Sequence, residues 1–197
     1  MVAQPVERSI NQVEVRRFTV EEFQRLISLG VLPEDERVEL VEGTIVAMSP
    51  INVPHVLAVN QLTRLLGAQV GDRAILSIQN PVRLGQFTMP QPDVALWRRQ
   101  PDGYRGRLPD PDDLLLVIEV ADSSTEYDRG GKAALYAAAG VEEYWVVNLP
   151  AQVVEVYRQP REGSYRAIMR LTAGDNAVVG AFPDVVIPVE AVLSGQV

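Results

Sequence analysis

The sequence predicts an α/β fold in which helices flank a mixed central sheet. Residues 114–120 are almost continuously apolar, as in a central strand that is covered on both faces. A predicted helix at 126–139 separates them from a second apolar strand at 143–148, and this strand–helix–strand order makes the two strands parallel. Residues 153–157 and 165–171 flank a turn at 161–164 and predict an antiparallel hairpin. Parallel and antiparallel pairs together make the predicted sheet mixed.

The segments before the central strand predict an N-terminal helix and hairpin. Thr19 and Glu22 have the spacing of a capping box, so a helix begins at Thr19 and is expected to end by Gly30. Residues 38–48 favour strands around a turn at Glu42–Gly43. A second helix is expected from Pro54 to Val70. Three short strands are expected at 74–79, 82–84 and 93–97.

Length and pattern predict one domain. The 197 residues divide into a polar lead-in at 1–17 and a single domain at 18–197. The tail, which carries Pro183 and Pro188, is expected to be an edge element.

Composition excludes several classes of protein. The chain has no cysteine, which excludes disulfides, thiolate zinc sites and cysteine nucleophiles, and its single histidine excludes a multi-histidine metal site. A net charge of −8 argues against non-specific coating of nucleic acid, although a local basic patch is compatible with it. We expect no membrane span and no secretory signal, and we predict a cytoplasmic location.

Two acids at the ends of apolar strands are the main candidates for chemistry. Asp93 opens the strand at 94–97 and Glu119 comes near the end of the strand at 114–120, 26 positions later. Buried carboxylates are paired with cations or coordinate metals, so acids on neighbouring strands suggest a Mg²⁺ site that could activate water for phosphodiester hydrolysis. The alternative is that Asp93 belongs to a turn and that Glu119 pairs with an arginine.

Lys132 and Glu39 could complete this site. Lys132 lies on the helix that follows the Glu119 strand and could orient or deprotonate a metal-bound water, or balance charge in the transition state. The alternative is an exposed pair with Asp128 on the same helix face. Glu39 could point into a cleft if Leu40 packs away from it, whereas Glu42 is interpreted as a turn residue.

The loop at 98–113 is the one basic patch that the sequence predicts. It carries Arg98, Arg99, Arg105 and Arg107 with two aromatic residues, Trp97 and Tyr104, and directly follows the Asp93 strand. Arginine binds phosphate and aromatic rings stack on bases, so the loop could hold nucleic acid beside the acids; the alternative is a solvated loop with Trp97 in the core. His55, near the start of the second helix, could contact a phosphate or could be a capping or surface residue.

These segments together resemble the PD-(D/E)xK nuclease superfamily, and most closely its Uma-type branch of restriction endonucleases. The order and spacing of the matching segments carry the resemblance, which spans about residues 18–188. The segments are 37–43, 48–50, 91–94, 117–120, 123–125, 127–132 with Tyr136, and 140–145.

The resemblance implies a role for each of four residues. Asp93 and Glu119 match the two metal-binding acids, and Glu39 matches an acid that helps to hold the metal. The superfamily lysine normally stands two residues after the second acid, where this chain has Ala121. In this branch the lysine moves to the following helix, which makes Lys132 the candidate.

Three hypotheses follow from the residues and the resemblance. The first is a Mg²⁺-dependent DNA endonuclease, with Mn²⁺ as a possible substitute, that works as a homodimer. The second is a catalytically inactive protein that keeps the nuclease fold and binds nucleic acid or protein. The third is a hydrolase of a non-nucleic phosphodiester.

Overall fold

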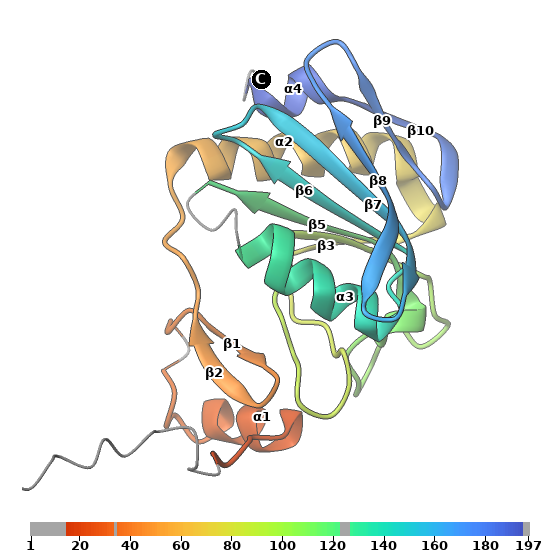
Figure 1. The fold of residues 1–197 in the computed structure, drawn as a ribbon. Helices are drawn as coiled ribbons and strands as arrows, with labels where there is room; N and C mark the ends of the chain where they lie inside the picture. Colours follow the sequence, from red (N-terminus) through yellow and green to blue (C-terminus); the bar gives the residue numbers. More distant parts are fainter. Residues whose placement is uncertain (1–14, 34, 123–126, 195–197) are drawn as a thin grey trace, which may run out of the picture.

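A six-stranded sheet forms the centre of the computed structural model, which describes residues 15–33, 35–122 and 127–194 (Figure 1). Its strand order is β3-β4-β5-β6-β7-β8. β5 (Leu114–Ala121) and β6 (Glu143–Asn148) are parallel, as predicted, and the other neighbours are antiparallel. The remaining strands are β3 (Ile75–Ile78), β4 (Val94–Trp97), β7 (Val153–Arg161) and β8 (Ser164–Leu171).

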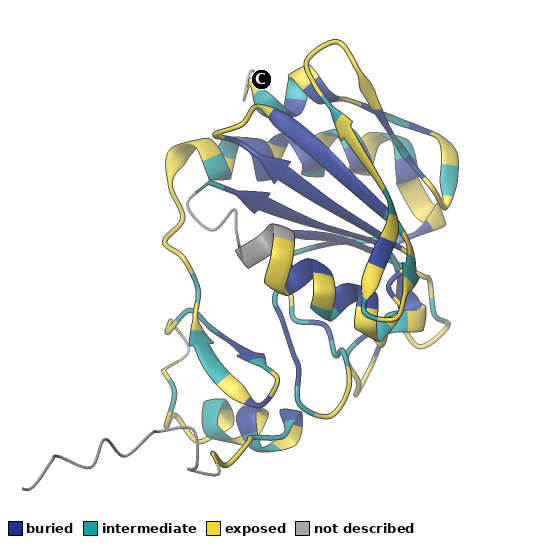
Figure 2. Ribbon diagram, viewed as in Figure 1, coloured by how far each residue is buried: buried dark blue, intermediate teal, exposed yellow. Residues whose placement is uncertain are grey.

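Helices cover both faces of this sheet. α2 (Val53–Val70) packs on one face, where Leu116, Ile118 and Val120 of β5 share its core. α3 (Ala133–Ala139), which continues from a π-helical turn, η4 (Tyr127–Lys132), packs on the other face with Val117 and Ala121. β5 and β6 are therefore buried along almost their whole length, as Figure 2 shows. Since alternate side chains of a strand face opposite sides, Glu119 faces α3.

The N-terminal helix and hairpin form a smaller layer beside the sheet. α1 (Val20–Ser28) begins with the predicted capping box of Thr19 and Glu22, and β1 (Val38–Val41) pairs with β2 (Thr44–Ala47). The segment between β3 and β4 reaches the hairpin, where Met89 bridges Leu40 (Figure 1). The turn needs Gly43, whose φ is +83° and whose added Cβ would lie 2.5 Å from Arg17 Cβ.

Two segments differ from the sequence prediction. The expected strand at 82–84 is wrong: Val82 and Leu84 make isolated backbone bonds to Pro90 and Thr88, because the nearby prolines lack the amide donors of a regular ladder. The tail is not a single edge element but a hairpin, β9 (Asn176–Val179) and β10 (Phe182–Pro188). It packs on α2 through Gln69, which exchanges two 2.9 Å bonds with the Val186 backbone. Three short helices complete the fold: η2 (Gly71–Arg73), η3 (Pro111–Asp113) and α4 (Val189–Leu193).

Some sequence predictions fall outside the described residues. These are the lead-in at 1–14, Glu34 of an expected acidic turn, the matching segment 123–125, the start of the predicted third helix at 126 and the side chain of Asp128. No helix within the described ranges is both long and apolar enough to cross a membrane.

Candidate active site

Antiparallel pairing of β4 with β5 brings Asp93 and Glu119 to the same end of the sheet. Val94 is opposite Ile118, so Asp93, directly before β4, lies beside the end of β5 that carries Glu119. The Val120 amide donates a hydrogen bond of 2.9 Å to Asp93 Oδ2. Both carboxylates are buried. The structure therefore brings both acids to the same end of two neighbouring strands, and their role as metal ligands stays a prediction.

Lys132 connects Glu119 to the N-terminal hairpin. Its ammonium Nζ lies 3.0 Å from Glu119 Oε1 and 3.3 Å from Glu39 Oε2. Only 6% of Lys132 is exposed, so the alternative of an exposed helix pair is wrong. The π-helical turn that ends at Lys132 widens the backbone just before α3, and such turns are frequent at functional sites.

Tyr136 is one helical turn after Lys132 and shares its partner. Its hydroxyl donates a 3.0 Å hydrogen bond to Glu119 Oε1. Burial, followed by the negative charge of Glu119, raises the pKa of Tyr136 well above its usual value. The hydroxyl thus keeps its proton and remains a donor that fixes the Glu119 carboxylate.

Glu39 reaches the site because the hairpin turns its neighbour away. Leu40 is fully buried in the small core with Phe23 and Met89, and adjacent side chains of a strand point in opposite directions. Glu39 therefore faces Lys132, and its Oε2 also accepts a 3.4 Å hydrogen bond from the Gln91 amide. Glu42 is an exposed turn residue, as predicted.

His55 contacts Asp93 from the first turn of α2. Asn52 caps this helix by accepting a 3.1 Å hydrogen bond from the His55 amide. The ring Nε2 lies 3.0 Å from Asp93 Oδ2, while the buried Nδ1 has no hydrogen-bond partner among the described residues. The alternative of a capping or surface histidine is therefore wrong.

Asp93 is held in its charged form by these contacts. Burial alone would raise the pKa of Asp93, but hydrogen bonding and charge from His55, with the Val120 amide and Gln79, lower the pKa below its ordinary value. An ionised, buried carboxylate is therefore available at neutral pH as a ligand or as a partner of His55.

One cleft of about 290 Å³, between the hairpin, α2 and the end of β5, is lined by Glu39, His55, Asp93, Glu119 and Lys132. Two further charged residues of its wall were missed from the sequence. Arg37 precedes β1, and Asp122 follows β5 and accepts a hydrogen bond from the Asn52 side chain. Arg37 opens the matching segment 37–43, but only the folded hairpin and sheet place it on the same cleft as Asp122.

A simpler signal was present for two of the site residues. Lys132 is the only lysine and His55 the only histidine among the 197 residues. Both singular residues lie on this cleft, in contact with its acids.

The residues of the cleft fit a hard divalent cation in their chemistry. Glu39, Asp93 and Glu119 supply oxygen ligands, which Mg²⁺ and Mn²⁺ prefer, and their burial favours a bound positive charge. Across the residues whose positions are described, however, no three acids or histidines form a ready-made metal cluster. The Lys132 ammonium instead lies between Glu39 and Glu119.

The arginine loop does not lie beside these acids. It follows the opposite end of β4, where the Arg98 amide bonds to Asp113 at the start of β5. The expectation that the loop flanks the site is therefore wrong, because the loop and the acids lie at opposite ends of β4. Arg98, Arg99, Arg105 and Arg107 are absent from the wall of the cleft.

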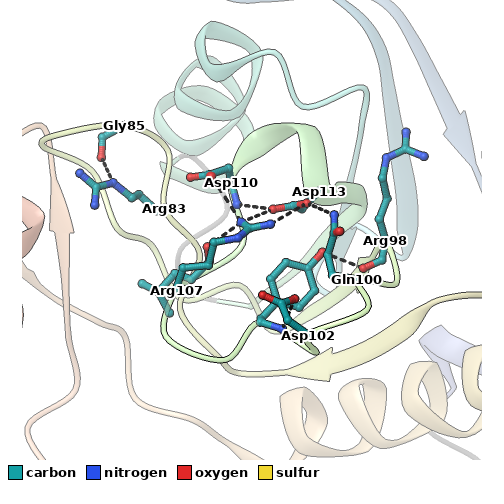
Figure 3. A network of polar contacts seen from close by, with 10 residues as sticks. Arg83, Gly85, Arg98, Gln100, Asp102, Arg107, Asp110 and Asp113 are labelled. Atoms are coloured by element: carbon teal, nitrogen blue, oxygen red, sulfur yellow. Dashed lines mark hydrogen bonds and ion pairs between the residues drawn. The ribbon is translucent and has the colours of Figure 1, made fainter.

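Internal contacts occupy much of this loop (Figure 3). Arg107 binds the buried Asp113 at 2.6 Å, and Arg98 donates to the Asp112 carbonyl at 2.9 Å. Tyr104 is buried, packs edge-on against Trp97 and donates to the Arg98 carbonyl. The loop thus has a structural explanation, and nucleic-acid binding by its arginines stays a prediction.

A mixed sheet between helices, with two acids and a lysine at one end of its central strands, places the protein in the nuclease fold class. The described fold is similar to the crystal structure of "a putative nuclease belonging to DUF820" from Anabaena variabilis ATCC 29413, with a TM-score of 0.71 and 19% identity over 90% of this chain and 98% of that one. The chain belongs to the Uma2 family, described as "Putative restriction endonuclease", whose model matches residues 20–190. No curated protein matches the chain.

Proposed function

We propose that this protein is a divalent-metal-dependent DNA endonuclease whose active site is the cleft of Asp93, Glu119, Glu39 and Lys132. The observation that carries the proposal is the contact of Lys132 with Glu119 at 3.0 Å. It supplies the lysine–acid pair of the superfamily although Ala121 occupies the usual lysine position. Membership of the Uma2 family supports the same reaction class.

Asp93 and Glu119 are the proposed metal ligands, with Glu39 assisting. Mg²⁺ is the proposed ion, and Mn²⁺ a substitute with the same ligand preference. When bound, the ion supplies Lewis-acid chemistry: it activates water and neutralises charge that develops on the phosphate. Asp93 suits this role because its pKa is lowered, so that it is ionised at neutral pH.

Lys132 is proposed to orient water and to stabilise charge rather than to act as a base. The Lys132 Nζ already contacts two carboxylates, and an ammonium has three donors and no acceptor. Its positive charge can instead stabilise the pentavalent transition state in a water-poor cleft. His55 is proposed to hold Asp93 through Nε2 and to offer Nδ1 to a phosphate or water in the cleft.

The experiment is a cleavage assay on plasmid and single-stranded DNA with Mg²⁺, Mn²⁺ or EDTA. Asp93→Asn and Glu119→Gln are expected to lose at least about 100-fold in rate while the fold is kept. Asp184→Asn, which changes an exposed carboxylate of β10, is the matched control. Cleavage at the wild-type rate in Asp93→Asn would refute the assignment.

The same assay decides the alternative of an inactive binding protein. Absence of cleavage with every metal and both substrates would favour that alternative. A homodimer belongs to the active proposal, because each cleft would cut one strand and a double-stranded cut needs two. Light scattering during gel filtration tests the homodimer directly.

A further inference from the structure

Arg37 is the one arginine among the described residues that line the cleft. It lies at the base of the hairpin, where its carbonyl accepts a 2.9 Å bond from the Met48 amide. Its guanidinium Nη1 donates a 2.7 Å hydrogen bond to the Ser49 carbonyl. These contacts hold the half-buried side chain in the wall of the cleft.

The charges of the cleft give Arg37 a distinct role. Four carboxylates line it, those of Glu39, Asp93, Glu119 and Asp122. Lys132 already contacts two of them, so its charge is offset within the site. The hydrogen-bond partner of the Arg37 guanidinium, by contrast, is a neutral carbonyl. Arg37 therefore gives this acidic cleft a positive charge that is not paired with any carboxylate in the described part of the chain. A phosphate that enters the cleft can bind to this charge.

We infer that Arg37 binds a backbone phosphate of the nucleic-acid strand in the cleft, and this inference rests on the proposed endonuclease function. Guanidinium carries five N–H donors in a planar fork, and the Ser49 contact needs only one of them. The remaining donors can take a phosphate that neighbours the reacting one. The strand then lies between residues 47–50 and the start of α2, whose residues form the two sides of the cleft.

Arg17 provides a matched control for this inference. Like Arg37, it donates from its guanidinium to a backbone carbonyl, here that of Glu42 at 2.6 Å. It is exposed, contacts the turn of the hairpin and is absent from the wall of the cleft. Loss of one positive charge is the same in both variants, so a difference between them reports position rather than net charge.

The test is fluorescence anisotropy of a fluorescein-labelled oligonucleotide, single-stranded and duplex, over a range of salt concentrations. Arg37→Ala, Arg37→Lys and Arg17→Ala are made in an Asp93→Asn background, so that the strand stays intact. Arg37→Ala is expected to weaken binding about tenfold or more and to reduce the salt slope by about 1. Arg37→Lys should keep the slope and lose only part of the affinity, while Arg17→Ala should match its parent.

Equal affinities for Arg37→Ala and its parent, or equal losses for Arg37→Ala and Arg17→Ala, would overturn the inference. A purely structural role would also overturn it, and would appear as a lowered melting temperature with an unchanged salt slope in Arg37→Lys and Arg37→Ala. Wild-type cleavage is measured in parallel. If it persists, a negative binding result removes Arg37 alone; if wild type neither binds nor cuts, the proposed function and the inference fail together.

Discussion

Replacing Lys132 with methionine should destabilise the metal-free protein strongly. The side chain is 6% exposed and its ammonium is within 3.3 Å of two buried carboxylates, Glu39 and Glu119. Methionine fills a similar volume but leaves those two negative charges facing each other without their shared cation. The expected effect is therefore electrostatic, with little contribution from a cavity.

The size of this effect follows from burial. Removal of one partner from a buried ion pair costs about 3–5 kcal/mol. For a chain of this length, each kcal/mol lowers the melting temperature by about 2–4 °C, so a fall of roughly 6–20 °C is expected. A divalent cation that binds between the acids should restore part of the loss, by about 2.7 kcal/mol at a hundred times its dissociation constant.

Thermal denaturation with EDTA and with increasing Mg²⁺ measures both effects. Arg166→Met is the matched control, because it removes an exposed cation that contacts Glu162 at i, i+4 and should change stability by less than about 1 kcal/mol. If Lys132→Met melts like this control, the ammonium is not an essential partner of the buried acids. If it melts early but Mg²⁺ gives it no more stability than wild type, the acids do not form the proposed metal site.

Three further predictions test the surroundings of the site. Tyr136→Phe removes a donor to the charged Glu119 but keeps the ring contact with Tyr144. It should lower the free energy of unfolding, measured by chemical denaturation, by about 1.5–3 kcal/mol and should slow cleavage. An unchanged free energy and rate would contradict a role for this hydrogen bond. Glu143→Ala should lower the unfolding free energy by about 3–5 kcal/mol without altering cleavage by the folded fraction, because the buried Glu143 accepts bonds from Trp145, Arg158 and Gly180 away from the cleft. Burial would raise the pKa of Asp113, but hydrogen bonding by Arg107 lowers this pKa to about 2. The stability that this pair contributes is therefore complete above pH 3.8, the ordinary value, and is lost as the pH falls towards 2. Asp113→Asn should therefore be less stable than wild type at neutral pH, and that difference should narrow between pH 4 and 2; a difference independent of pH would refute the pairing.

Much of the fold was predictable because its signals are local. The capping box of Thr19 and Glu22, the turn at Gly43 and the continuous apolar run of β5 each depend on residues that are close in sequence. The strand–helix–strand order also settled the parallel pairing of β5 with β6. The β9–β10 hairpin was missed, because its stability comes from packing against α2, more than a hundred residues earlier in the chain.

The site divides in the same way. The sequence alone predicted the acids Asp93 and Glu119 at strand ends and a lysine on the next helix. The chemistry of a side chain and its place in a helix or strand follow from residues that are close in sequence. Only the tertiary structure decided that Lys132 contacts Glu39, that the arginine loop lies at the far end of β4, and that Arg37 borders the cleft. The physical reason is that strand register and hairpin docking join distant segments through burial and hydrogen bonding, which no single segment encodes.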